Sequence, residues 1–182
     1  LCYNILNTGE TFSVRNLDIN SRYSGFAPMY YQGDKIVFAS SVDSAFFKTR
    51  PYKWNDQPYL DLYVARMNEE SSALGSAVKF SKEINTKYHE AAVTFSPDHQ
   101  TMYFTRNNYG KKLRRDRVGV NHLKIYRSQK VNGQWTEAEE LDFNGESFST
   151  GHPALSPDGK LAAFILDGDV FVTGVTSKDD QK

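Results

Sequence analysis

The chain has 182 residues, of which 39% are hydrophobic and 24% charged, so it is long enough to bury the core of one ordinary domain. Its 22 Lys and Arg balance its 22 Asp and Glu, which excludes a global field that would attract nucleic acid or anionic lipid. Uninterrupted apolar runs are far shorter than the roughly 20 residues of a transmembrane helix. The single cysteine, Cys2, excludes an intrachain disulfide and a multi-thiolate zinc site.

Three similar hairpins follow one another along the chain, at residues 25–40, 90–106 and 151–165. The content of 12 Phe, 11 Tyr, 2 Trp and 12 Gly already favours strands and turns. The third hairpin turns at Ser-Pro-Asp-Gly, in which proline presets φ and Gly159 accepts a positive φ. The second copy has His99 in place of that glycine, and the first turn is one residue shorter.

Each hairpin is followed by further strand-like segments. Apolar and polar residues alternate at 61–65, 124–127 and 169–172, which predicts a third strand in each copy. A fourth strand is predicted at 77–80 and at 135–141, and a lone outer strand at 10–17. The chain therefore consists of one outer strand, two quartets and three final strands.

An asparagine recurs in register after the outer strands, at Asn20, Asn85 and Asn144. The neighbouring apolar residue recurs after 65 residues from Ile19 to Ile84 and after 59 from Ile84 to Phe143. A four-strand unit of roughly this length is typical of a β-propeller blade. We expect the three asparagines to form hydrogen bonds in the turns between blades.

These observations predict an all-β fold, a β-propeller of four-stranded antiparallel blades with about three blades visible, as a fragment of a larger propeller. An immunoglobulin-type sandwich is disfavoured because its strands do not recur as matched quartets. Open edges would allow self-association. The predicted units are an outer strand of a preceding or closing blade at 1–24, blades at 25–88 and 89–148, a partial blade at 149–176 and a polar tail at 177–182.

The Ser-Pro-Asp turns at 96–98 and 156–158, each followed by a strand, resemble the TolB-type, WD40-like propeller repeat. The strings at 19–24, 35–40 and 101–109 are similar to the propeller segment of OmpA-family envelope proteins of Bacteroidetes. The resemblance covers nearly the whole chain. It implies a periplasmic, outer-membrane-associated and peptidoglycan-linked protein, with some relatives in type IX secretion and gliding.

Two long connections, 42–60 and 107–123, join the second and third strands of the first two units. Because equivalent strands run in the same direction, both loops should emerge from one face, where they would form a basic patch with an aromatic rim. We expect this patch to contact an envelope protein or an anionic cell-wall polymer. The alternative is a pair of solvated loops that pack only on their own blades. The candidate binding residues are Lys48, Arg50, Trp54, Lys111, Lys112, Arg114, Arg115 and Arg117.

No catalytic motif stands out. The histidines are isolated, and neither a Gly-x-Ser-x-Gly elbow nor the spacing of a calcium loop is present. We therefore predict no enzymatic activity, no cofactor, no metal and no nucleic-acid partner.

The predicted function is that of a non-catalytic interaction or scaffold module. Two alternatives remain open: the propeller of a prolyl-oligopeptidase-type serine peptidase, with its catalytic domain elsewhere, and a glycan-binding propeller that uses Tyr52 and Trp54.

Overall fold

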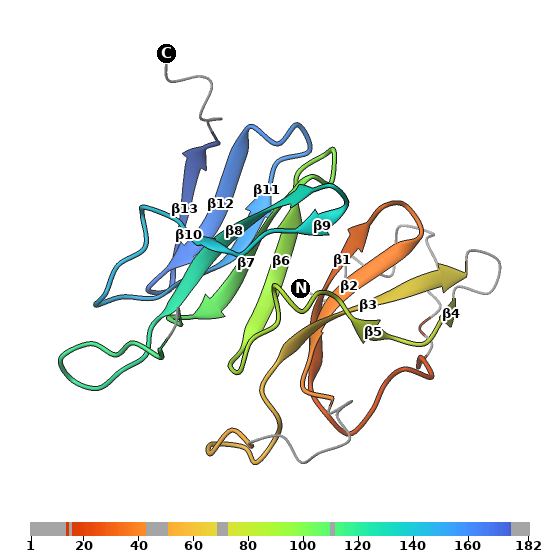
Figure 1. Ribbon diagram of the computed structural model, residues 1–182, viewed down its shortest axis with the longest axis horizontal. Helices are drawn as coiled ribbons and strands as arrows, with labels where there is room; N and C mark the ends of the chain where they lie inside the picture. Colours follow the sequence, from red (N-terminus) through yellow and green to blue (C-terminus); the bar gives the residue numbers. More distant parts are fainter. Residues whose placement is uncertain (1–13, 15, 43–50, 69–72, 110–111, 176–182) are drawn as a thin grey trace, which may run out of the picture.

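The computed structural model describes residues 14, 16–42, 51–68, 73–109 and 112–175. All regular structure in this part is β-strand, which confirms the all-β prediction (Figure 1). No helix that could cross a membrane is found among these residues.

The strands form three antiparallel sheets, which follow one another along the chain. The first sheet contains β1 (Gly25–Tyr31), β2 (Lys35–Ser40), β3 (Asp61–Asn68), β4 (Ala73–Leu74) and β5 (Val78–Lys79). The second contains β6 (Glu90–Phe95), β7 (Thr101–Asn107), β8 (Leu123–Val131), β9 (Gln134–Trp135) and β10 (Glu139–Glu140). The third contains β11 (Thr150–Leu155), β12 (Leu161–Leu166) and β13 (Asp169–Gly174).

The predicted hairpins are β1–β2, β6–β7 and β11–β12, and the third strands are β3, β8 and β13. The first strand of each sheet has a bulge, where Ala27, Ala92 and His152 adopt positive φ angles of 52°, 41° and 53°. A bulge increases the local twist of a strand. The three sheets therefore share their bends as well as their strand order.

Turn chemistry explains why the hairpins form locally. In the third turn Ser156 Oγ donates to Asp158 at 2.6 Å, and the same carboxylate accepts the N–H of Lys160 at 3.0 Å. Gly159 has a φ of 72°, as its place in the turn requires. His99, at the equivalent position of the second turn, adopts a φ of 55° although it carries a Cβ atom.

The outer strands differ from the prediction. The fourth strand predicted at 77–80 is reduced to β5, and the strand predicted at 135–141 is divided into β9 and β10. Residues 136–138 lie between these two strands, and Thr136 still bonds Gln129 there, since its N–H donates to the carbonyl of Gln129 and its hydroxyl accepts the N–H of Gln129. Of the predicted strand at 10–17, residues 10–13 and 15 lie outside the described residues, and Leu17 is not in a strand. The polar tail at 177–182 also lies outside them.

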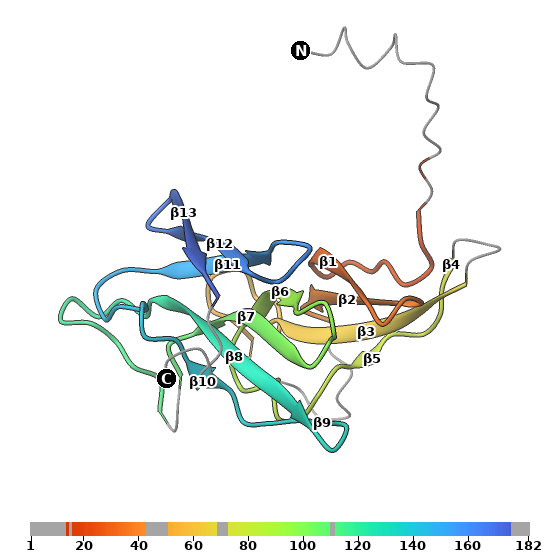
Figure 2. The ribbon, with the colours of Figure 1, turned by 90° about the horizontal axis from the view of Figure 1, so that it is seen from above.

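The second sheet lies between the other two (Figures 1 and 2). Strand β6 packs against β1, β2 and β3, and β11 packs against β6, β7 and β8. The first strands of the sheets are therefore neighbours, and the later strands fan outward. The main core lies between the first and second sheets and consists of Tyr31, Val37, Ala39, Leu62, Ile84, Val93, Phe95, Met102, Phe104, Tyr126 and Trp135.

A clasp between the start of the first strand and the end of the second recurs in every sheet. The N–H of Ser24 donates to Ser41 Oγ at 3.1 Å, that of His89 to Asn107 Oδ1 at 3.0 Å, and that of Ser149 to Asp167 Oδ1 at 3.0 Å. In return, Ser41, Asn107 and Asp167 donate their own N–H groups to the carbonyls of Ser24, His89 and Ser149. The clasp holds the base of each following connection in the same place.

Candidate functional site

The two long connections leave their sheets at the same end, the lower end in Figure 1. Of the predicted binding residues, Lys48, Arg50 and Lys111 lie outside the described residues. The structure places Trp54 on the β2–β3 connection and the remaining four, Lys112, Arg114, Arg115 and Arg117, on the β7–β8 connection, where all four are exposed.

The described part of the β2–β3 connection is held by a small hairpin. Pro51 and Pro58 form a bridge, and the N–H of Tyr52 donates to the carbonyl of Gln57 at 2.7 Å. Gln57 Oε1 accepts from the hydroxyl groups of Ser24 and Ser41 at 3.0 and 2.7 Å, which ties the loop to the clasp of the first sheet. Trp54 lies at the tip with 85% of its surface exposed.

The β7–β8 connection is organised around Asp116. Its carboxylate accepts the N–H groups of Val118 and Val120 at 3.0 and 2.8 Å, and its second oxygen lies 2.9 Å from His122 Nε2. The hydrogen bond with His122, followed by the backbone donors, lowers the pKa of Asp116. Arg115 donates to the carbonyl of Gly119 at 2.7 Å. The arginines therefore extend from a defined turn.

A chain of rings joins the bases of the two connections. The ring centroids of Tyr52 and Tyr59 lie 4.7 and 4.6 Å from that of His89. The centroid of Tyr59 lies 5.4 Å from that of Tyr88, and the centroid of Tyr88 lies 4.9 Å from that of Tyr109. Burial lowers the pKa of His89 to about 4, so its imidazole is neutral at pH 7. The neutral ring can accept the N–H of Leu60 at its Nδ1, 3.1 Å away.

A cavity of about 460 Å³ opens between these connections and the bulged first strands. Both loops contribute to its wall, with Tyr52 and Trp54 from one and Asn121 from the other, while Ala92 and His152 line the sheet side. The predicted aromatic rim is therefore beside a real cavity. We define the loop face as this cavity together with residues 51–60 and 112–122.

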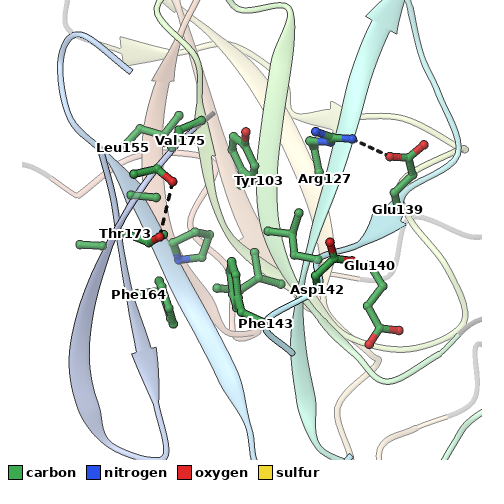
Figure 3. Close-up of a pocket in the computed structure, with 16 residues that line it drawn as sticks. Tyr103, Arg127, Glu139, Glu140, Asp142, Phe143, Leu155, Phe164, Thr173 and Val175 are labelled. Atoms are coloured by element: carbon green, nitrogen blue, oxygen red, sulfur yellow. Dashed lines mark hydrogen bonds and ion pairs between the residues drawn. The ribbon is translucent and has the colours of Figure 1, made fainter. Parts of the chain in front are cut away.

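A second cavity, which sequence reasoning missed, lies between the second and third sheets (Figure 3). Its volume is about 390 Å³, and its wall combines Ile125, Phe143 and Phe164 with the charged side chains of Arg127 and Glu139. Arg127 donates to Glu139 at 2.7 Å, while its buried Nε atom has no hydrogen-bond partner. Sequence reasoning could have found the arginine because it occupies a position that is apolar in the first sheet, Val64.

Three side chains of the β7–β8 and β10–β11 connections form a serine–histidine–aspartate chain. Ser149 Oγ lies 3.3 Å from His122 Nδ1, and His122 Nε2 lies 2.9 Å from Asp116. The Ser149 hydroxyl also accepts the N–H of Leu123 at 3.2 Å, as His89 accepts that of Leu60 in the first sheet. Neither Ser149 nor His122 lines either of the two cavities described above. The arrangement therefore fits a structural role.

No group of three or more His, Cys, Asp or Glu side chains that could hold a metal ion occurs in the described part of the chain. No protein-family model matches the sequence, and no curated protein matches it. The features of the chain that bear on function are consequently the geometry of the loop face and the repeat itself.

Proposed function

We propose that the chain is a stretch of β-propeller that serves as a non-catalytic interaction scaffold, with the loop face as its recognition surface. Three sheets of the same topology, with their first strands side by side and their later strands fanned outward, support the propeller arrangement. The resemblance to TolB-type repeats of OmpA-family envelope proteins favours the bacterial periplasm as its setting.

The observation that carries the proposal is the shared position of the two long connections. They belong to different sheets, yet they flank one cavity and are joined by the ring chain from Tyr52 to Tyr109. Loops held on a stiff β scaffold are typical recognition surfaces. Because the exposed charges of the turn at 112–119 are mainly cationic, the partner we propose is an anionic polymer or an acidic protein surface.

The proposal is tested by reversing charges on the loop face. We expect Arg115→Glu combined with Arg117→Glu to reduce retention on heparin and polyglutamate resins at low salt, because two favourable charge contacts become repulsive. Lys35→Glu combined with Lys160→Glu is the matched control, since both lysines lie at the opposite ends of the strands. Equal retention of the two double variants would contradict the proposal.

A glycan-binding scaffold is the second candidate, and it is favoured by one observation. Trp54 is 85% exposed at the mouth of the cavity, whereas the other tryptophan, Trp135, is buried. An exposed indole offers an apolar face beside polar groups, as sugar rings require. We expect soluble peptidoglycan fragments to change the intrinsic fluorescence of the wild type but not that of Trp54→Phe. An unchanged wild-type spectrum at millimolar fragment would exclude this candidate.

A further inference from the structure

A set of side-chain hydrogen bonds connects the first sheet to the segment that leads into the second. Asn85 accepts the N–H of Leu62 at 2.8 Å and donates to the carbonyl of Leu62 at 3.0 Å, so its carboxamide brackets one residue of β3. Four residues later, His89 accepts the N–H of Leu60. We call this set of bonds to the third strand a latch.

The second sheet has the same latch. Asn144 accepts the N–H of Ile125 at 3.0 Å and donates to its carbonyl at 2.8 Å, while Ser149 accepts the N–H of Leu123. Asn144 also donates to the carbonyl of Leu141, so the hydrogen bond that we predicted in a turn is found for Asn144, whereas both bonds of the Asn85 side chain go to Leu62 of β3. The latched residues Leu62 and Ile125 are 0% and 1% exposed.

Strand register identifies the third position that a latch would hold. Leu62 pairs with Ala39, Ile125 with Thr105 and Val170 with Ile165, at equivalent places in the three sheets. Val170 on β13 is 71% exposed, and β13 is the edge strand of its sheet in the described part of the chain. Gly168 takes the place of Leu60 and Leu123. The third sheet thus presents the receiving half of a latch.

The donating half lies at the other end of the described chain. Asn20 and Ser24 precede β1 with the spacing of four residues that separates Asn85 from His89, and both are exposed. The face of the first sheet beside them is also uncovered: Tyr30 is 66% exposed, whereas its equivalent Phe95 is 8% exposed in the core. A cavity of about 520 Å³ lies along this face, with Asn20 and Phe38 in its wall.

One molecule cannot join these halves, because the first and third sheets lie on opposite sides of the second (Figure 1). We propose that the first sheet of a second copy of the chain stacks on the third sheet, with its Asn20 bracketing Val170 and its Ser24 receiving the N–H of Gly168. Two copies joined head to tail at both ends bring six sheets into one ring, within the roughly four to eight blades of propellers.

The continuity with existing interfaces is the reason for choosing a second copy as the occupant. The two uncovered faces have the register, the apolar positions and the hydrogen-bonding groups of faces that already pack against each other inside the molecule. The inference rests on the propeller arrangement proposed above but is independent of what the loop face binds. A monomer that retains heparin binding would overturn this inference alone.

The test measures the mass of the full chain by size-exclusion chromatography with light scattering between about 1 and 200 µM. We expect the wild type to have twice the chain mass of 20.7 kDa and Val170→Asp to be monomeric. Val118→Asp is the matched control and should remain dimeric, because Val118 is also largely exposed but lies on the loop tip. Asn20→Ala should raise the dimer dissociation constant at least tenfold, and Asn16→Ala much less. A monomeric wild type at 200 µM overturns the proposal.

Mixing two variants tests the head-to-tail arrangement. Tyr30→Asp disrupts the first-sheet face and leaves β13 intact, whereas Val170→Asp does the reverse. We expect each variant alone to be monomeric and the equimolar mixture to recover dimers through the one intact pair of faces. If Tyr30→Asp alone remains dimeric, the two copies pair through β13 edges instead, and the proposed interface is wrong. Circular dichroism confirms that both variants are folded.

Discussion

The two interfaces between neighbouring sheets are built on the same scaffold but are packed differently. Between the first and second sheets, the ring centroids of Tyr31 and Phe95 are 4.6 Å apart and those of Phe80 and Trp135 are 5.8 Å apart. These rings fill the space between the two sheets. Between the second and third sheets, a cavity of about 390 Å³ remains beside Arg127. The repeat therefore specifies strand order and register, while side-chain volume at equivalent positions decides how tightly each interface closes.

Register shows which substitutions open the second interface. Val37 and Val64 pair with each other in the first sheet. The equivalent pair in the second sheet is Tyr103 and Arg127. The side chains that face these pairs across each interface also differ. Phe95 and Met102 of the second sheet, at the first interface, correspond to Leu155 and Ala162 of the third sheet, at the second interface. Two larger apolar side chains are thus replaced by smaller ones, and an arginine brings a charge that must keep its access to water.

The largest expected effect is the difference in stability cost between breaking two ion pairs, a buried one at the first interface and an exposed one at the second. Arg106 Nε donates to Glu90 at 3.0 Å, both side chains are buried, and Arg106 also donates to the carbonyl of Ile84. We expect Arg106→Ala to lower the free energy of unfolding by about 3–5 kcal/mol, because the buried Glu90 loses its cationic partner and keeps only the hydrogen bonds from Thr86. Arg127→Ala, which removes the exposed pair with Glu139, should cost less than about 1 kcal/mol.

Urea unfolding of both variants at pH 8 and pH 5 measures these costs. Burial raises the pKa of Glu90 to about 7, so its carboxyl takes up a proton at pH 5 and the isolated charge disappears. The loss caused by Arg106→Ala should therefore be smaller at pH 5 than at pH 8. Similar losses for the two arginine variants at pH 8 would remove the contrast between the interfaces.

The latches provide the next test, because the two latches make the same hydrogen bonds although the two interfaces are packed differently. Asn85→Ala and Asn144→Ala each leave a backbone N–H and carbonyl of a buried residue without their partner, which should cost about 1–3 kcal/mol. Asn144→Ala should cost more, since Asn144 also donates to the carbonyl of Leu141 and accepts from Thr150. Urea unfolding followed by fluorescence measures both. A negligible cost for either would show that water replaces the carboxamide.

A pH-dependent difference should distinguish His89 from Ser149, which occupies the same position in the next repeat. The pKa of His89 falls to about 4 in the folded chain, compared with about 6.5 when unfolded, so between these values only the unfolded chain binds the proton. Stability contributed by His89 is therefore present above pH 6.5 and declines as the pH falls toward 4, by at most about 1.4 kcal/mol per pH unit.

The variant His89→Ser tests this contribution, because serine supplies the same hydrogen-bond acceptor without a titrating group. The difference in unfolding free energy between wild type and variant, measured from pH 4.5 to 7.5, should shrink toward low pH. Other titrating groups, Glu90 included, contribute to both proteins and largely cancel in the difference. A difference independent of pH would show that the pKa of His89 is the same in the folded and the unfolded chain.

The smallest effect should come from giving Ala162, at the second interface, the side chain that its equivalent residue carries at the first interface. Ala162 lines the cavity of about 390 Å³, and its equivalent in the second sheet is the buried Met102. We expect Ala162→Met to raise the free energy of unfolding by about 0.5–2 kcal/mol, because a flexible apolar side chain occupies the empty space. Thermal unfolding is sufficient to detect it. A loss of stability would show that the cavity cannot accept this volume.

Much of the local structure could be predicted from the residues themselves. The hairpins at Ser96 and Ser156 form because serine, proline and aspartate satisfy the turn within a few residues. The Asp116–His122 bond was missed because it depends on how one irregular connection folds, and the contact of His122 with Ser149 was missed because these two side chains come from separate connections. For Trp54, the sequence predicted a place in an aromatic rim but not the cavity beside it.

The sequence by itself determined the strand order, the hairpins and the recurrence of asparagine, since turn geometry and side-chain alternation act over a few residues. Only the tertiary structure decided which strands Asn85 and Asn144 bracket, how the rings at the bases of the two loops meet beside one cavity, and why the second interface retains a cavity. These features depend on side-chain volumes and hydrogen-bonding groups that meet across sheets, and such pairs are set by stacking rather than by distance along the chain.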